Sequence, residues 1–364
     1  MKEPIIYLPS VIVDSHCHGR DMLQAHKTTV LQTLLEASKG GISISFFMPN
    51  TDPPIIDLDT LVWYIGLTVK AEMELGLRHR QFVYFGATDF NFEDCRQAMR
   101  ISGVVGIKVY PADKKGKTVT TGTIGVADDK TILKLIRLSE ETGKPIAFHC
   151  DDPEIISKEG NTIRAETAYV EKILKMALDF PRAKIVICHV SCIQSANLVL
   201  KAQRIGIQVA LELCPHYLWF NADGKNWNPE LDPVFYHCYN NLRPKNHREY
   251  LVELLADEKN FIIIGSDNAP HTKEEKLEKK FGGLPSNQEM VAVVLTLAQQ
   301  MGILNQRIIN LLCLNAAKFF QIPICGKLKP YKLEKRVVDA EYNSDIVVNP
   351  WRGSELYFPV PVEE

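Results

Sequence analysis

The chain has 364 residues, of which 46% are hydrophobic and 24% charged, with a formal net charge of −2 and a pI near 6.6. These values are typical of a globular protein, and they give no reason to expect a nucleic-acid partner. No apolar run approaches the ~20 residues of a membrane span, and the N-terminus lacks the apolar core of a signal peptide. We therefore expect a cytoplasmic protein with no membrane partner, whose nine cysteines are reduced thiols.

Eight short β-branched or apolar runs follow one another along the chain, most of them separated by helix-length segments. The first strand is predicted at Val11–His16, and the helix after it at Gln24–Lys39, ended by Gly40 and Gly41. The other strands are predicted at Ile42–Met48, Phe82–Thr88, Val104–Tyr110, Pro145–Cys150, Lys184–His189, Ile207–Leu213 and Phe261–Asp267. The other helices are predicted at Leu58–Leu75, Asp128–Thr142, Ile163–Ala177, Ile193–Arg204, His247–Leu255, Asn287–Gln300 and Gln306–Phe320. Because alternating strands and helices imply right-handed parallel crossovers, we predict an α/β fold, a (β/α)₈ TIM barrel.

The pattern changes from Gly326 onward. Lys327–Val338 is basic and aperiodic, and only Asp345–Val348 reads as a short strand. We predict a barrel domain over residues 1–325 and a small C-terminal appendage, residues 326–364, that packs on the barrel.

Residues of the types that commonly bind metal ions lie at the ends of several predicted strands. His16 ends the first strand, and His18 points the same way because residues two apart share a face. The same alternation turns the cysteines beside such residues the other way, and we predict Cys17, Cys150 and Cys188 to be packing residues. Since the active site of this fold lies at the carboxyl ends of the strands, one mouth should collect six side chains. These are His16, His18, Lys108, His149, His189 and Asp267.

This set exceeds what one tetrahedral zinc ion needs, and it suits two divalent ions about 3.5–4 Å apart that share a bridging hydroxide. A buried lysine with a lowered pKa can react with carbon dioxide, and a carbamate on Lys108 would be an anionic bridge. The alternative for Lys108 is a positive charge that faces an anionic substrate. His216, which follows the seventh strand, is a weaker candidate for the mouth.

Groups that could hold a substrate lie just beyond these strand ends. Arg20 offers a fixed fork for a carboxylate, Asn50 can both donate and accept, and His271 adds a further donor. The alternative for Arg20 is a surface ion pair.

These motifs together resemble the dihydroorotases of the amidohydrolase superfamily, in order from about Leu8 to Phe320. The resemblance rests on His16-x-His18-x-Arg20, Met48-Pro-Asn-Thr51, Gly106-Ile-Lys-Val-Tyr-Pro111, Phe148-His-Cys-Asp151, Cys188-His-Val190, Pro215-His-Tyr-Leu218 and Ser266-Asp-Asn-Ala-Pro-His271. It implies that His16, His18 and Asp267 hold one zinc ion. It also implies that His149 and His189 hold a second, with N6-carboxylated Lys108 as the bridge. Arg20, Asn50 and His271 would bind the substrate carboxylate and ring.

Two segments depart from the family pattern. The Asn-Pro-Pro-Leu-Arg of the longer family form reads Tyr239-Asn-Asn-Leu-Arg243 here, and we place Tyr239 among the substrate contacts. The loop expected to close on substrate, residues 112–126, is lysine-rich, and either Thr120 or Thr121 could serve in it.

The resemblance implies zinc-dependent, reversible hydrolysis of (S)-dihydroorotate to N-carbamoyl-L-aspartate in pyrimidine biosynthesis. Asp267 would take a proton from the attacking water and return it to the leaving nitrogen. One alternative is a related cyclic amidohydrolase of the dihydropyrimidinase, hydantoinase or allantoinase type. Another is a catalytically silent homologue that serves as a scaffold for aspartate transcarbamoylase. The expected partner is a small-molecule substrate, and a homodimer is compatible with the resemblance.

Overall fold

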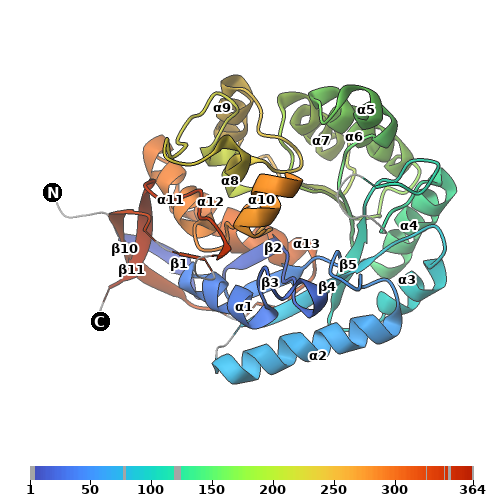
Figure 1. Cartoon of the computed structure of the whole chain (residues 1–364), viewed down its shortest axis with the longest axis horizontal. Helices are drawn as coiled ribbons and strands as arrows, with labels where there is room; N and C mark the ends of the chain where they lie inside the picture. Colours follow the sequence, from blue (N-terminus) through green and yellow to red (C-terminus); the bar gives the residue numbers. More distant parts are fainter. Residues whose placement is uncertain are drawn as a thin grey trace.

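Eight parallel strands follow one another in chain order around a nearly closed barrel in the computed structural model (Figure 1). The structure describes residues 5–76, 79–118, 124–324, 326–339, 341–342 and 346–362. The barrel strands are β2 (Val13–Cys17), β3 (Ile44–Phe47), β4 (Arg80–Gly86), β5 (Val104–Val109), β6 (Ile146–Phe148), β7 (Ile185–Ile187), β8 (Val209–Leu213) and β9 (Ile262–Ile264). Every neighbouring pair from β2 to β9 is parallel, and the predicted TIM barrel is confirmed.

Helices surround this barrel and cover its outer face (Figure 1). The longer ones are α1 (Val30–Lys39), α2 (Leu58–Leu75), α4 (Asp129–Thr142), α6 (Ile163–Ala177), α7 (Ile193–Arg204), α9 (Lys245–Leu254) and α11 (Met290–Met301). Shorter ones are η1 (Met22–Gln24), α3 (Phe92–Ala98), α5 (Pro153–Glu159), α8 (Pro215–Trp219), η2 (Pro233–Tyr236), α10 (Lys273–Lys279), α12 (Asn305–Ile309), η3 (Asn310–Leu314) and α13 (Asn315–Phe319). No helix in the described part of the chain is both long and apolar enough to cross a membrane.

The longer helices match the predicted segments, and the differences have local causes. The helix predicted from Gln24 begins at Val30, because the Thr29 side chain accepts a hydrogen bond from the backbone N–H of Gln32 and caps it there. Helices α3, α5, α8 and α10 were not predicted. Each has only five to seven residues, too few for a helical hydrophobic period to be recognised.

The barrel closes where the first strand meets the segment that follows the last. Cys17 and Asn268 form a parallel bridge there, the N–H of Asp267 donates to the carbonyl of His16 at 2.8 Å, and the N–H of His18 donates to the carbonyl of Asn268 at 2.9 Å. The two histidines and the aspartate that are far apart in sequence therefore become neighbours through backbone hydrogen bonds.

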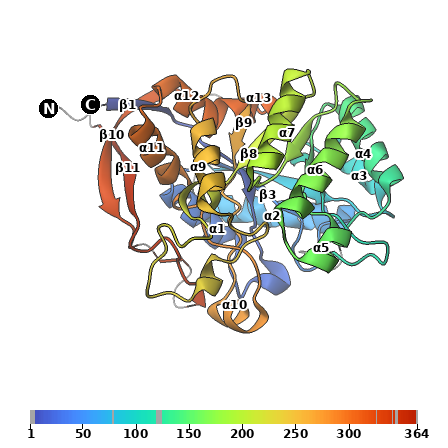
Figure 2. The ribbon, with the colours of Figure 1, turned by 90° about the horizontal axis from the view of Figure 1, so that it is seen from above.

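The opposite end of the barrel is closed by an apolar floor. Phe320, just after α13, lies 4.8 Å from the ring of Phe46 and 6.2 Å from the ring of Tyr84. Figure 2 shows α13 and α10 at opposite ends of the barrel. The barrel interior therefore has one sealed end, and the site must lie at the other.

A separate three-stranded antiparallel sheet lies beside the barrel, in the order β1-β10-β11. It consists of β1 (Ile5–Pro9), β10 (Leu328–Val337) and β11 (Glu355–Pro361) (Figure 1). The expectation that 327–338 contains no strand was wrong. Strand β10 is largely exposed, so its burial does not alternate, and it is stabilised by pairing with both neighbours. The predicted strand Asp345–Val348 begins outside the described residues, and Val347 forms only an isolated bridge with Tyr342.

This sheet joins the two ends of the chain, so the first strand of the molecule pairs with the C-terminal part. The N–H of Tyr357 in β11 donates to Thr296 Oγ1 of α11 at 2.7 Å, which attaches the sheet to a barrel helix. The division at residue 325 stays a prediction.

Candidate active site

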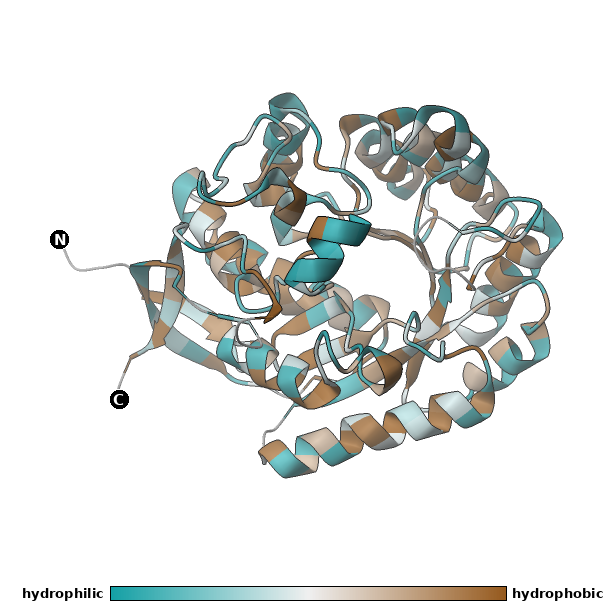
Figure 3. Ribbon diagram, in the orientation of Figure 1, coloured by the Kyte–Doolittle hydropathy of each residue, from teal (hydrophilic) through white to brown (hydrophobic). Residues whose placement is uncertain are grey.

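A cavity of about 630 Å³ opens at the carboxyl ends of the barrel strands. Nine of the ten predicted site residues line it: His16, His18, Arg20, Asn50, His149, His189, Tyr239, Asp267 and His271. The tenth, Lys108 of β5, is fully buried. Helix α10, which crosses this end of the barrel, is almost wholly hydrophilic (Figure 3).

His16 is held by a carboxylate that lies deeper in the barrel. Its Nδ1 donates to Glu212 Oε1 at 2.8 Å, and the backbone N–H of His189 donates to the same oxygen at 3.0 Å. Because Nδ1 carries the proton, His16 Nε2 presents a lone pair toward Asp267 Oδ1, 3.3 Å away. Burial lowers the pKa of His16 well below its ordinary value, and the charge of Lys108 lowers it further, so the imidazole is neutral.

His18 shows the same arrangement with a different partner. Its Nδ1 donates to Asn50 Oδ1 at 2.7 Å, which leaves Nε2 facing Asp267 Oδ1 at 3.1 Å. Two ring lone pairs and one carboxylate oxygen thus meet at one point, as the ligands of a divalent cation do.

His149 and His189 form the second half of the cluster. His149 Nε2 donates to the buried carboxylate of Asp151 at 3.0 Å, so its Nδ1 is the acceptor nitrogen. That atom lies 3.0 Å from His189 Nε2. Burial, with the charges of His149 and Lys108, lowers the pKa of His189 well below its ordinary value, so this ring is neutral too.

Lys108 lies below the four histidines. Its Nζ donates to Cys188 Sγ at 2.9 Å and lies 5.3 Å from the centre of the Tyr110 ring. Cys188 packs in the core as predicted, and its thiol also accepts this hydrogen bond. The ring of Tyr110 also lines the cavity.

Arg20 and His271 contact each other in the wall of the cavity. Arg20 NH2 lies 3.2 Å from His271 Nε2. Arg20 is only 5% exposed, and its buried Nε has no hydrogen-bond partner among the described residues. The alternative of a surface ion pair for Arg20 was wrong, since the guanidinium is buried and faces the cavity.

Of the other residues predicted at the rim, only some belong to the described part of the chain. Tyr239 lines the cavity, packed against Gly282, where a Cβ would lie 2.5 Å from the tyrosine ring. Thr118 also lines it, whereas Thr120 and Thr121 lie outside the described residues. His216 does reach this end: its Nε2 is 3.9 Å from Asp267 Oδ2, and burial lowers its pKa to about 4.

Two carboxylates important to the cluster were not predicted to contact the histidines. Glu212 stands inside the apolar run Ile207–Leu213, and a lone charge in a buried strand was the available signal. Asp151 follows His149 by two residues and accepts a hydrogen bond from His149 Nε2. Both fix the proton on one ring nitrogen, so that the other nitrogen faces inward.

The comparisons with known proteins agree with this geometry. Residues 6–333 match the model of the amidohydrolase family. The chain belongs to the amidohydrolase family. It is 28% identical to a dihydroorotase of Thermococcus kodakarensis, over 96% of this chain and 80% of that protein. These findings confirm the resemblance to dihydroorotases and the prediction of a metal-dependent cyclic amidohydrolase.

Two solved structures share the fold at low sequence identity. One is the dihydroorotase of Saccharomyces cerevisiae in complex with 5-fluoroorotic acid, with a TM-score of 0.81 and 20% identity over 98% of this chain and 100% of that one. The other is an L-hydantoinase (dihydropyrimidinase) from Arthrobacter aurescens, with a TM-score of 0.80 and 21% identity over 99% of this chain and 83% of that one. Because both likenesses are similar in strength, the choice of substrate depends on the side chains of the cavity.

Proposed function

We propose that this protein is a dihydroorotase that hydrolyses the cyclic amide of dihydroorotate to N-carbamoyl-aspartate, reversibly, in pyrimidine biosynthesis. The observation that carries the proposal is the environment of Arg20. Its guanidinium is buried in the wall of the cavity and has no carboxylate within 4.0 Å among the described residues. A buried cation of this kind is costly unless an anion joins it, and a ring carboxylate would be that anion.

The donor set fits two divalent metal ions, with zinc as the ion that the family resemblance favours. His16, His18 and Asp267 would hold one ion, and His149 and His189 the other. Three of the four rings have their proton fixed on the outer nitrogen by Glu212, Asn50 or Asp151, so that a lone pair faces inward. Lys108, as an N6-carboxylated side chain, would add a bridging anion from below. When bound, the ions supply the Lewis acidity that lowers the pKa of water toward neutrality and polarises the scissile carbonyl.

The protein's own side chains then transfer the proton and orient the substrate. Asp267 takes a proton from the attacking water, the water oxygen bonds to the amide carbon, and the ring C–N bond breaks. The electron pair of the broken C–N bond stays on the departing nitrogen, and Asp267 returns the proton to that nitrogen as an N–H. Arg20, Asn50 and His271 hold the ring carboxylate and orient the amide, and Tyr239 closes the facing wall of the cavity.

A hydantoinase or dihydropyrimidinase activity is the second candidate, favoured by the strong fold likeness to the L-hydantoinase. These substrates lack the ring carboxylate that would balance Arg20. The filled set of ligand positions also speaks against a silent scaffold for aspartate transcarbamoylase.

One preparation tests all three readings, with metal content measured beside turnover of dihydroorotate and dihydrouracil. A dihydroorotase binds close to two metal ions per chain and prefers dihydroorotate by about 10²-fold or more in kcat/KM. A preference for dihydrouracil would assign the second activity. A folded protein without metal and without turnover would favour the scaffold.

A further inference from the structure

One side chain, Asn161, connects a histidine that would hold a metal ion with the segment that carries Tyr239. We propose that Asn161 is a positioning residue, which couples the binding of metal at His149 to the position of the cavity wall at Tyr239. The proposal rests on the proposed function for the identity of the ion and of the ring, and on the structure for the hydrogen bonds. Asn161 belongs to neither the predicted ligands nor the predicted substrate contacts.

The first half of this connection lies behind His149. The buried carboxylate of Asp151 accepts at Oδ2 from His149 Nε2 at 3.0 Å and from Asn161 Nδ2 at 2.8 Å. One oxygen atom thus holds both the imidazole and the amide. Because the other nitrogen of His149 faces inward, an ion bound there would fix the ring, and the ring would fix the orientation of this carboxylate.

The second half of the connection runs from Asn161 to residues 239–243. Asn161 Oδ1 accepts from the backbone N–H of Asn241 at 2.9 Å and from Arg243 Nη2 at 3.2 Å. The backbone carbonyl of Asn161 accepts from Arg243 Nη1 at 3.0 Å. Tyr239, which lines the cavity, lies two residues before Asn241. The position of this wall of the cavity therefore depends on Asn161.

Arg243 extends the connection toward the second histidine of this half of the cluster. Its Nε donates to Ser191 Oγ at 2.9 Å, and Ser191 follows His189 by two residues. Its Nη2 also lies 3.3 Å from Glu166 Oε2, so the guanidinium, which is only 7% exposed, has a partner for its charge. Removal of the Asn161 side chain leaves this ion pair in place. The effect of such a change should therefore come from the lost connection and not from an unpaired buried charge.

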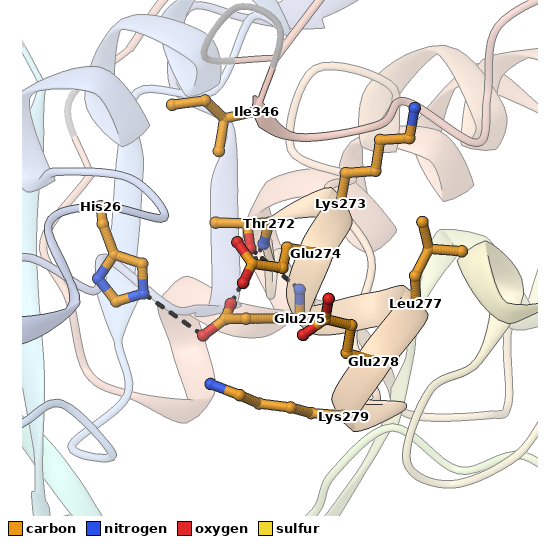
Figure 4. Close-up of a pocket in the computed structure, with 9 residues that line it drawn as sticks. All are labelled: His26, Thr272, Lys273, Glu274, Glu275, Leu277, Glu278, Lys279 and Ile346. Atoms are coloured by element: carbon orange, nitrogen blue, oxygen red, sulfur yellow. Dashed lines mark hydrogen bonds and ion pairs between the residues drawn. The ribbon is translucent and has the colours of Figure 1, made fainter.

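The part of the cavity wall that contains His271 is connected differently. His271 Nδ1 lies 3.4 Å from Glu275 Oε2, and Glu275 Oε1 lies 3.4 Å from Nε2 of His26, which lines a separate groove beside α10 (Figure 4). These contacts lead outward to an exposed histidine and not inward to His149. Helix α10 therefore serves as an internal comparison for residues 239–243.

Hydrogen exchange with zinc ions alone, without substrate, tests the connection. In the wild type, zinc should slow exchange of the backbone N–H of Asn241 about fivefold or more relative to the metal-free protein, because ion and wall are held through one carboxylate. Exchange in α10 should slow by a smaller factor. Asn161→Ala should remove most of the zinc effect on residues 239–243 and leave that on α10 unchanged. In turnover it should raise KM for dihydroorotate about fivefold, with kcat within about threefold.

Asn161→Asp separates the two halves of the connection. The aspartate keeps an acceptor oxygen for Asn241 but replaces the donor to Asp151 by a second oxygen, so the segment stays held while its response to zinc should be lost. If Asn161→Ala does not fold, this variant is held to the same result. Asn305→Ala is the matched control and should keep the full zinc effect. Asn305 likewise accepts from a backbone N–H and donates to a backbone carbonyl, both of Tyr7, and it does not line the cavity.

A zinc effect on residues 239–243 that survives in both Asn161 variants would overturn the proposal. Equal slowing in α10, or no slowing in the wild type, would overturn it as well. Because the exchange experiment contains no substrate, it is independent of the reaction. An Asn161-dependent zinc effect in a protein that leaves dihydroorotate unhydrolysed would refute the proposed function alone.

Discussion

The two ends of the barrel are built from opposite kinds of side chain. At the mouth, His16, Asp267 and their neighbours are buried polar groups, and Arg20, His189 and Asp267 have positive φ angles of 52°, 39° and 46°. At the floor, Phe46, Tyr84 and Phe320 pack edge to face. Positive φ costs a non-glycine residue of the order of 1–3 kcal/mol, and such strain persists where surrounding structure enforces it.

The floor and the mouth therefore contribute differently to the stability of the protein. The floor buries aromatic area at low conformational cost, whereas the mouth holds strained backbone and unbalanced charge in place for a substrate. Changes at the mouth should therefore act mainly on activity, and changes at the floor mainly on stability.

The largest effect is expected from Asp267→Asn at the mouth. Asparagine tolerates the φ of 46° and keeps the shape, but it cannot take a proton, so kcat should fall about 10²–10⁴-fold while the melting temperature changes little. Steady-state kinetics, metal content and thermal unfolding on one sample measure this. Turnover close to that of the wild type would remove Asp267 from the proposed mechanism.

Phe320→Ala tests the floor. Loss of a buried aromatic side chain should lower the free energy of unfolding by about 3–5 kcal/mol, with KM for dihydroorotate almost unchanged. Denaturant unfolding measures it, and Phe90→Ala, at a side chain that is 97% exposed, is the control with a change below about 0.5 kcal/mol. The contrast between the two ends fails if Phe320→Ala impairs catalysis more than stability.

Glu212→Gln tests the support behind the mouth. The substitution keeps the shape but removes the charge that orients His16, so affinity for metal should fall about 10–100-fold. Competition with a chelator measures the affinity. Ser15→Ala, which removes the hydroxyl that lies 3.1 Å from Glu212 Oε2 and 3.0 Å from the carbonyl of Ile264, should have a smaller effect. Equal effects would show that the orientation of His16 does not depend on the carboxylate charge.

The smallest effect concerns His79, just before the amino end of β4, where burial lowers its pKa to about 4 from 6.5. Because the folded state binds this proton less readily than the unfolded chain, its contribution to stability is complete above pH 6.5 and declines as pH falls toward 4. The loss is at most about 1.4 kcal/mol per pH unit. His79→Gln should flatten the fall of stability between pH 6.5 and 4, and an unchanged slope would contradict the assignment.

Much of the fold followed from periodicity, because parallel strands are short apolar runs and helices between them have clear start and stop residues. The six candidate metal ligands were likewise predicted from the strand ends, since this fold directs all such ends to one mouth, whereas Tyr239 was chosen by comparison with the family pattern. Strand β10 and helices α3, α5, α8 and α10 were missed, because an exposed strand and a two-turn helix leave weak patterns. Glu212 was missed as a partner of His16 because a hydrogen bond between strands has no fixed spacing in sequence, and Asp151 was missed although it lies only two residues from His149.

The sequence by itself determined the type of fold and the candidate metal ligands, because both depend on local patterns along single strands. Only the tertiary structure decided which nitrogen of His16 and of His18 faces inward, since Glu212 and Asn50 come from other parts of the chain. It also decided that the guanidinium of Arg20 is buried in the wall of the cavity beside His271. The charges that face a cavity depend on the folded chain, because residues hundreds of positions apart in sequence become neighbours there.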